Sequence, residues 1–188
     1  MTLLDAASSR PMEGGPSFSL GNRLLRVLWM ASWLLLARFT PPPLHNWRRL
    51  VLRVFGAKVG RGTRVHGSAM IWLPSHLELG DRVLIGPGVR LYNQGRICIG
   101  DYTVISQRAH LCASTHDIRD PDFQLVCRPV TIGIRCWVAA EAFVGPGVMM
   151  GDRAVLGARG AMFENARPDG VYGGNPAMFI KERGLPHD

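Results

Sequence analysis

Large apolar residues recur at every sixth position along most of this chain. The series shifts by two residues after Ile71 and again after Leu91, and it skips 112–131 before steps of six resume at Ile132. Its fifteen positions are Val59, Val65, Ile71, Leu79, Ile85, Leu91, Ile99, Ile105, Leu111, Ile132, Val138, Val144, Met150, Leu156 and Met162. The residue four places after each is never larger than valine. This period matches neither an α-helix nor a simple strand, whose periods are about 3.6 and 2.

A period of six predicts a short strand followed by a corner. Three such units close a triangular coil of roughly 18 residues, and successive coils stack as parallel strands about 4.8 Å apart. The fifteen units therefore predict an all-β solenoid of about five coils over residues 57–167, with a C-terminal tail at 168–188. Glycines such as Gly60 and Gly80 follow the large positions, where we expect them to permit a sharp change of backbone direction.

A helical segment over residues 23–56 is predicted before the repeat. Residues 23–39 fit one helix, which the prolines at 41–43 would end, and residues 46–55 fit a second. The apolar residues of the second helix fall at helical spacing, and we expect them to cover the open end of the solenoid: Trp47, Leu50, Val51, Val54 and Phe55. The arginines Arg48, Arg49 and Arg53 would then face solvent.

The start of the chain differs from the rest in order and charge. Residues 1–22 show no periodicity and are expected to form a flexible lead-in. The net charge is +8, of which residues 1–58 hold +6 (eight basic against two acidic residues). Because residues 59–188 hold only +2 (fourteen against twelve), a nucleic-acid-binding surface on the solenoid is not expected.

The helix predicted at 23–39 has two interpretations. Its charge-free stretch, 27–37, is too short to span a bilayer, which needs roughly 20 apolar residues. Trp29 and Trp33, with arginines at the flanks, suit a helix that lies in a membrane interface. Packing against the solenoid or against a neighbouring subunit is the equal alternative.

Cysteine usage indicates a reducing compartment. The four cysteines at 98, 112, 127 and 136 form no CxxC pair, and residues 1–16 lack the charged-then-apolar order of a secretory signal. We expect a cytoplasmic protein with reduced thiols, and any membrane contact at the inner face of the cytoplasmic membrane.

Six segments resemble the hexapeptide-repeat O-acetyltransferases of the left-handed parallel β-helix class. They are SFSLGNRLLRVLW at 17–29, LHNWRRLVLRVFGAKVG at 44–60, IGPGVRLYN at 85–93, ISQRAHLCASTHD at 105–117, VAAEAFVGPGV at 138–148 and GGNPAMFIKER at 173–183. The resemblance covers residues 17–184 and is greatest to acetyltransferases assigned to colanic acid biosynthesis. It implies a left-handed coil, a homotrimer, acetyl-CoA as donor, no metal, and a sugar hydroxyl of a polysaccharide precursor as acceptor.

His116 is the candidate general base. Acetyl transfer to a hydroxyl requires a group that takes the proton as the oxygen attacks the thioester, and an imidazole suits this task near neutral pH. His116 stands where the chain leaves the repeat for the loop 117–131, and the resemblance places the family's catalytic histidine there. Asp117 or Glu141 would orient the ring, although a turn former and a solvated carboxylate are the simpler interpretations. Asn93 is a candidate sugar-binding residue or an ordinary corner asparagine.

The resemblance also indicates the donor site. It points to Trp137, Ala139 and Ala140, to Gly157 and Ala158, and to Lys181 and Arg183 in the tail. This chain departs from many relatives at Phe163, Glu164 and Met178, where they carry Thr-Lys and an arginine, so the ligands of the coenzyme A phosphates stay open. Arg159 and Arg167 are further candidates for these ligands.

Two other functions compete with acetyl transfer. A catalytically silent hexapeptide-repeat scaffold would explain the departures at the phosphate positions. A metal lyase resembling the γ-class carbonic anhydrases would need three converging histidines. His110 and His116 are six residues apart, which places them on successive faces of a three-sided coil, so His76, His110 and His116 are not expected to share a metal. A nucleophilic cysteine has no neighbouring base in the sequence.

Overall fold

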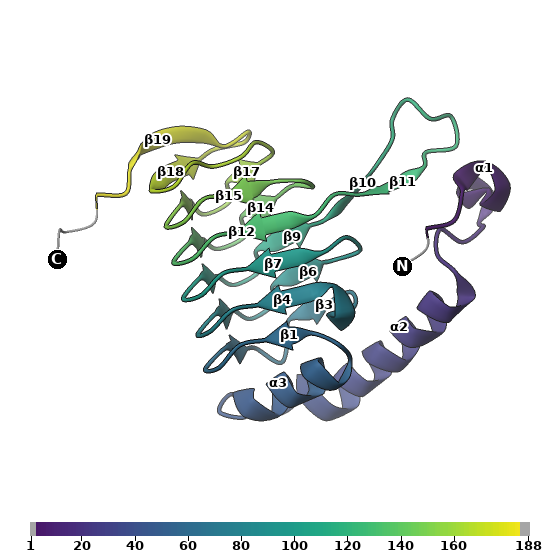
Figure 1. The fold of residues 1–188 in the computed structure, drawn as a ribbon, viewed down its shortest axis with the longest axis horizontal. Coiled ribbons are helices and arrows are strands. Elements are labelled where there is room, and N and C mark those ends of the chain that lie inside the picture. The colour runs from purple at the N-terminus through teal and green to yellow at the C-terminus, as the bar shows by residue number, and fades with distance from the viewer. Residues whose placement is uncertain (1–2, 185–188) are drawn as a thin grey trace.

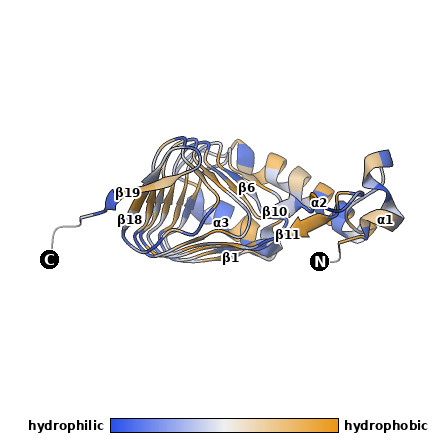
Figure 2. Cartoon of the chain, turned by 90° about the horizontal axis from the view of Figure 1, so that it is seen from above, coloured by the Kyte–Doolittle hydropathy of each residue, from blue (hydrophilic) through white to orange (hydrophobic). Residues whose placement is uncertain are grey.

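The computed structural model of the chain describes residues 3–184, which form a parallel β-solenoid with an N-terminal helical cap (Figure 1). Five complete coils stack in one direction, and part of a sixth follows, so the predicted all-β solenoid is confirmed with slightly more than the predicted five coils. The coil is left-handed, as the resemblance implied. Seen along the stack, the coils overlie one another (Figure 2).

Three sheets form the faces of the prism. The first face contains β1 (Lys58–Val59), β4 (Leu77–Leu79), β7 (Ile97–Ile99), β12 (Val130–Ile132) and β15 (Met149–Met150). The second contains β2 (Arg64–Val65), β5 (Leu84–Ile85), β8 (Val104–Ile105), β13 (Trp137–Val138), β16 (Val155–Leu156) and β18 (Gly170–Gly173), with β19 (Met178–Glu182) antiparallel to β18. The third contains β3 (Met70–Ile71), β6 (Arg90–Tyr92), β9 (His110–Cys112), β14 (Phe143–Val144) and β17 (Ala161–Met162).

The interior is filled by the residues that the six-residue period identified. All fifteen large apolar positions are buried, from Val59 at 7% exposure to Leu156 at 0%. The extra residues of the first coils lie at the third corner, where the chain passes from the third face to the next first face. There Leu73, Asn93 and Ala113 stack inside the prism, while the small positions Ser75 and Thr115 are exposed. The two-residue shifts in the pattern therefore mark one widened corner.

The glycines after the large positions serve a different purpose from the predicted one. Gly60 and Gly80 do not have positive φ angles, so left-handed backbone is not the reason for them. A Cβ on Gly60 would collide with the backbone of Gly80 in the next coil. Glycine is required there because adjacent coils approach too closely for a side chain.

The N-terminal cap consists of two helices. The first, α2 (Leu20–Trp33), continues as a π-helical turn, η2 (Leu34–Arg38), and α3 (His45–Val54) follows. In α2 and η2 the buried side chains are Trp29, Trp33 and Ala37. The predicted orientation of α3 is wrong in part, because Arg48 is fully buried while Trp47, Leu50 and Val54 are 41–74% exposed; Val51 and Phe55 do pack on the core, as predicted. No helix described within residues 3–184 has both the length and the apolar character needed to cross a membrane.

The first coil explains why the arginines of α3 contact the solenoid. In later coils, the backbone carbonyls of residues with inward side chains point along the stack and accept hydrogen bonds from N–H groups of the preceding coil. For example, Leu79 O accepts from Gly60 N at 2.8 Å. The first coil has no predecessor, so cap side chains supply the donors. These bonds are Trp29 Nε1 to Ile71 O (2.8 Å), Trp33 Nε1 to Ala69 O (3.1 Å), Arg48 Nε to Val65 O (2.7 Å), Arg49 Nη1 to Thr63 O (3.2 Å) and Arg53 Nε to Val59 O (3.0 Å). The cap therefore satisfies an exposed sheet edge as well as covering the core.

The lead-in also differs from the sequence-based expectation. Within it lie α1 (Ala6–Ser9) and a 3₁₀ turn, η1 (Pro11–Glu13). The Gln124 amide accepts from Ala6 N (2.7 Å) and donates to Leu4 O (3.3 Å), which ties the lead-in to the protruding loop. Phe18 packs against Trp72, with ring centroids 6.0 Å apart. These partners are remote in sequence, so local periodicity could not indicate them.

Candidate active site

His116 is the last residue of the first strand of a hairpin, and this hairpin leaves the solenoid at the third corner of the third coil; Figure 1 shows it protruding from the coils. The hairpin consists of β10 (Ser114–His116) and β11 (Leu125–Cys127), which pair antiparallel with His116 opposite Leu125. The bond from Asp117 N to Gln124 O, at 2.9 Å, continues the pairing beyond the strands. The backbone that carries His116 is therefore held on both sides.

The hydrogen bond of the imidazole determines its tautomer. His116 Nδ1 lies 2.6 Å from Phe123 O. A carbonyl oxygen only accepts, so Nδ1 must carry the proton and donate it. In the neutral ring, Nε2 is then left with a lone pair that can take a proton from a hydroxyl. The bond gives the ring the tautomer and orientation that a general base requires.

Asp117 and Glu141 have other partners in this structure. The Asp117 carboxylate accepts from Arg119 N at 2.9 Å, which is the hydrogen bond of a turn. Glu141 accepts from Arg159 Nε at 2.8 Å and faces Arg108 at 3.5 Å. The hydrogen bond from Arg159 holds the pKa of the Glu141 carboxyl below its usual value. The group that orients His116 in the single chain is the Phe123 carbonyl, which no side-chain pattern could reveal.

Asn93 lies inside the prism. Its side chain is fully buried, and its oxygen accepts from Trp72 N (2.9 Å) and Leu73 N (3.3 Å). Its amide nitrogen donates to Leu73 O at 2.6 Å. Asn93 therefore binds the backbone of the widened third corner in the preceding coil, where Trp72 N also donates to Leu91 O (3.1 Å) and Leu73 O also accepts from His76 N (3.1 Å). The sequence-based expectation of a sugar contact does not fit this position, because the residue is not exposed.

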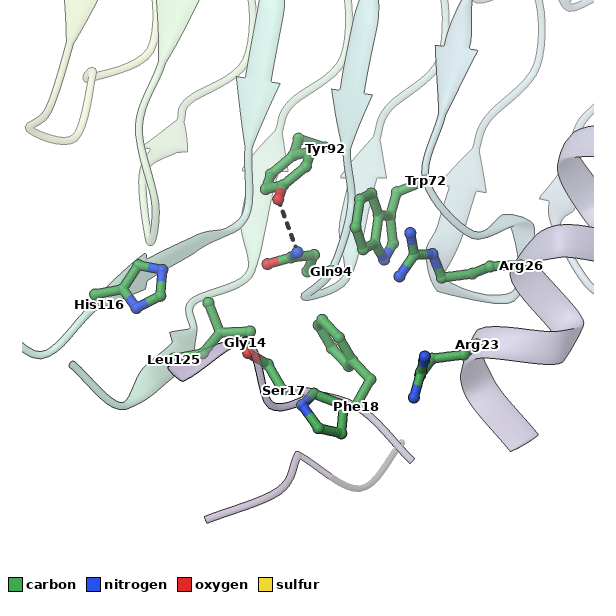
Figure 3. Close-up of a pocket in the computed structure, with 11 residues that line it drawn as sticks. Gly14, Ser17, Phe18, Arg23, Arg26, Trp72, Tyr92, Gln94, His116 and Leu125 are labelled. Carbon is green, nitrogen blue, oxygen red and sulfur yellow. Dashed lines mark hydrogen bonds between the residues drawn. The ribbon is translucent and has the colours of Figure 1, made fainter. Parts of the chain in front are cut away.

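A cavity of about 380 Å³ adjoins His116 (Figure 3). His116 lies at one side of it and Arg23 and Arg26 at the other, while Trp72, Tyr92 and Gln94 form the wall between them. Gln94 Nε2 donates to Tyr92 Oη at 2.9 Å. No pattern in the sequence indicates that these five residues share a site, since they come from α2 and from the third face and its corner. Only the tertiary fold brings them together.

The candidate donor residues gather at the second corner, between the second and third faces. Ala139 and Ala140 follow β13, and Gly157 and Ala158 follow β16 in the next coil. Ala139 N donates to Leu156 O (2.9 Å) and Gly157 N to Tyr172 O (2.8 Å). Within residues 3–184, the N–H groups of Ala140 and Ala158 have no acceptor. Two free amides one coil apart suit the amide carbonyls of a pantetheine arm.

Trp137 and the basic residues around this corner have distinct environments. Trp137 is 46% exposed, and its indole N–H donates to Ser106 Oγ at 2.9 Å. Lys181, on β19, is exposed and forms no ion pair in the described part of the chain. Arg183 Nη1 instead donates to Arg135 O (2.7 Å) and Arg153 O (2.9 Å) at the first corner, so its guanidinium fastens the tail to the coils.

The remaining phosphate-site candidates are already paired or apolar. Arg159 is engaged by Glu141, and Arg167 pairs with Glu182 at 2.6 Å. Phe163 and Met178 are 55% and 67% exposed. Neither Lys181 nor Arg183 forms an ion pair in residues 3–184, but two backbone carbonyls hold the Arg183 guanidinium, so Lys181 is the one of the four basic candidates whose side chain has no polar partner there.

The surroundings of the histidines and of Cys136 favour neither a metal site nor a nucleophilic thiol. His76 Nδ1 contacts Gln94 O at 2.8 Å, and the His110 ring packs between Tyr92 and Phe143. In the described residues, no three His, Cys, Asp or Glu side chains gather as metal ligands. Burial raises the pKa of the Cys136 thiol to about 11, which disfavours the thiolate that a nucleophile requires.

No family model matches the sequence. The Escherichia coli (strain K12) protein named "Putative colanic acid biosynthesis acetyltransferase WcaF" is 40% identical over 163 residues, which cover 87% of this chain and 90% of the relative. A hexapeptide-repeat-containing acetyltransferase from Vibrio cholerae O1 biovar eltor, crystallised with acetyl coenzyme A, superimposes with a TM-score of 0.80 at 20% identity, over 89% of this chain and 92% of that one. The maltose O-acetyltransferase of Clostridium difficile 630 has a TM-score of 0.80 at 21% identity, over 87% and 89%. The two structural likenesses show a shared fold.

Proposed function

This chain belongs to the hexapeptide-repeat acetyltransferase family, and from that premise we propose that it transfers an acetyl group from acetyl-CoA to a sugar hydroxyl. The observation that carries the proposal is His116, whose Nδ1 is held by Phe123 O and whose Nε2 stays available beside a cavity. The name of the 40% identical relative supports an acceptor from exopolysaccharide biosynthesis.

The reaction follows from the tautomer of His116. Nε2 takes the hydroxyl proton while the sugar oxygen attacks the carbonyl carbon of the thioester. The carbonyl oxygen becomes an oxyanion, which backbone N–H groups stabilise. When the intermediate collapses, the carbon–sulfur bond breaks, and the imidazolium returns its proton to the departing coenzyme A sulfur. The products are the acetylated sugar and free coenzyme A.

The donor site in this proposal lies at the second corner. The free amides of Ala140 and Ala158 bind the pantetheine arm, Trp137, Ala139 and Gly157 form its wall, and Lys181 meets a phosphate. Arg183 acts indirectly in this assignment, because it fixes the tail that carries Lys181.

Calorimetry with acetyl-CoA, followed by mass spectrometry of a panel of acceptor sugars, tests the enzyme proposal. We expect saturable binding of acetyl-CoA and an acetylated product. A folded chain that neither binds acetyl-CoA nor forms product would favour the silent scaffold. The residues Phe163, Glu164 and Met178, which replace the phosphate-binding residues of many relatives, are the sequence feature that supports this alternative.

We also propose a homotrimer whose active sites lie between subunits. His116 and the free amides of Ala140 and Ala158 occupy different corners of one prism, so one chain does not bring base and donor together. Threefold packing can place the third corner of one subunit beside the second corner of the next. Exposed aromatic residues at this corner and on the third face, including Trp137 and Phe163, provide apolar surface for the contact.

Light scattering should therefore give the mass of three chains. A sharper test mixes His116→Ala with Ala158→Trp, a variant in which a bulky side chain fills the donor corner. Each variant alone should be inactive, whereas coexpression should restore activity at about a quarter of the interfaces, where an intact His116 faces an intact donor corner. A monomeric mass, or mixtures as inactive as the separate variants, would contradict shared sites.

The exposed side of α2 supports contact with the cytoplasmic membrane surface. Apolar side chains along it and along η2 are 58–79% exposed, namely Leu24, Leu28 and Leu35. Vesicle flotation should recover the protein with anionic lipid membranes, and replacing Leu24, Leu28 and Leu35 by glutamine should reduce recovery at unchanged thermal stability. Equal flotation of wild type and variant would contradict the membrane proposal.

A further inference from the structure

Two arginines of α2 face the cavity beside His116 without acidic partners. Arg23 and Arg26 are one helical turn apart, and neither forms an ion pair in the part of the chain that the structure describes. None of the residues that line the cavity is acidic. The Arg26 guanidinium stacks on Trp72, with its carbon 3.5 Å from the ring centroid, so its position is fixed (Figure 3). Two uncompensated guanidinium groups on one wall favour a ligand with a negative charge.

The wall between the arginines and His116 holds polar atoms that lack partners. Gln94 is only 4% exposed, and its Oε1 is buried without a hydrogen-bond donor. Trp72 Nε1 is likewise buried without an acceptor. A buried polar atom that is left unpaired is destabilising, so both atoms favour a ligand that pairs with them. The cavity thus offers one acceptor and one donor beside aromatic rings, an arrangement that suits a sugar ring with its hydroxyl groups.

A second, apolar cavity continues from the first. Its volume is about 710 Å³, and it lies between the third face and the helical segment α2–η2, where Val27, Met30 and Leu34 line one side and Met70 and Arg90 the other. Arg26, Trp72 and Tyr92 line both cavities, so Arg26 stands at the junction. Most of its surface is apolar, and its charged lining residues are the arginines Arg26, Arg38 and Arg90. Its lining suits a hydrocarbon chain.

We infer that the acceptor is a sugar joined through a phosphate to a hydrocarbon chain, that is, a lipid-linked glycosyl phosphate. Its sugar occupies the cavity beside His116 and contacts Gln94 and Trp72. Its phosphate binds Arg23 and Arg26, and the proximal part of its chain follows the apolar cavity along α2. This inference rests on the proposed acetyl transfer, for which it names the class of acceptor.

Binding without catalysis tests the inference first. In calorimetry below the micelle concentration, farnesyl phosphate should bind at least about tenfold more tightly than either inorganic phosphate or farnesol, because each of these lacks one half of the recognised group. The double variant Arg23→Gln/Arg26→Gln should lose this preference. Arg64→Gln, which removes an exposed arginine on β2, is the matched control and should behave as wild type. Met70→Trp, which fills the apolar cavity, should weaken farnesyl phosphate binding and leave phosphate binding unchanged.

Turnover separates this inference from the proposed function. We expect kcat/KM to rise at least about tenfold from a neutral hexose to its 1-phosphate, and again to the farnesyl phosphodiester of the same sugar. Equal use of the neutral hexose, or preference for a nucleoside diphosphate sugar, would overturn the lipid-linked acceptor while acetyl transfer stands. No binding of acetyl-CoA and no product would overturn the proposed function. Farnesyl phosphate binding that the two arginine substitutions do not change would overturn the inference by itself.

Discussion

Replacing His116 by alanine should lower kcat by about 10²–10⁴-fold while acetyl-CoA binds with a Kd within about twofold of wild type. The loss follows from the position of Nε2, which the bond between Nδ1 and Phe123 O leaves as the proton acceptor. Donor binding should persist because the free amides lie at another corner of the prism. Initial rates of product formation and calorimetry on the same preparation measure the two quantities.

A second histidine provides the control for this experiment. His66 is half-buried in the first coil, and its Nδ1 contacts Ser68 Oγ at 2.9 Å, far from the hairpin. His66→Ala should retain nearly full turnover. If His116→Ala turned over at a rate near that of wild type, His116 would not be the base. A parallel loss of acetyl-CoA binding would indicate instead that the hairpin had changed its structure.

Arg48→Met should reduce the free energy of unfolding by about 3 kcal/mol or more. Methionine has a similar length but no donors. In the native chain Arg48 is fully buried and donates to Val65 O (2.7 Å), Thr40 Oγ1 (2.7 Å), Pro41 O (3.0 Å) and Pro42 O (2.6 Å). Methionine removes all four of these bonds, while Val65 O keeps its contact with His45 Nδ1 (3.2 Å) and Pro41 O keeps the N–H of Leu44 (3.1 Å). Urea unfolding followed by circular dichroism measures the change.

Arg64→Met is the matched control for stability, because Arg64 is exposed on β2 next to the affected strand position. Its effect should stay within about 0.5 kcal/mol. An Arg48→Met protein as stable as this control would mean that water replaces the guanidinium at the edge of the first coil. The cap would then contribute apolar packing alone.

The inward residues of the solenoid could be predicted because their signal repeats locally. Every large position from Val59 to Met162 is buried, and the period alone specifies which side of each short strand faces inward. The orientation of α3 could not be predicted in the same way. Helical periodicity favoured the stripe from Trp47 to Phe55, but the unpaired carbonyls of the first coil required donors, and Arg48 supplies them.

The residues of the candidate site also differ in whether the sequence could predict them. His116 could be identified because it interrupts a regular repeat at a loop. Gln94, Arg23 and Arg26 belong to distant segments, and only the folded chain brings them to one cavity. Asn93 was misleading because a polar residue in a corner looks exposed in the sequence, whereas the two-residue insertions turn this corner inward.

The bonds from the cap to the first coil also bear on how the chain folds as it leaves the ribosome. The helices at 20–54 are synthesised before any strand, and they contain the donors that Val59, Thr63, Val65, Ala69 and Ile71 need. Each later coil then finds the hydrogen-bonding edge of its predecessor already formed. Folding can advance in the direction of translation, one coil at a time, with no strand waiting for a partner that has not yet been made.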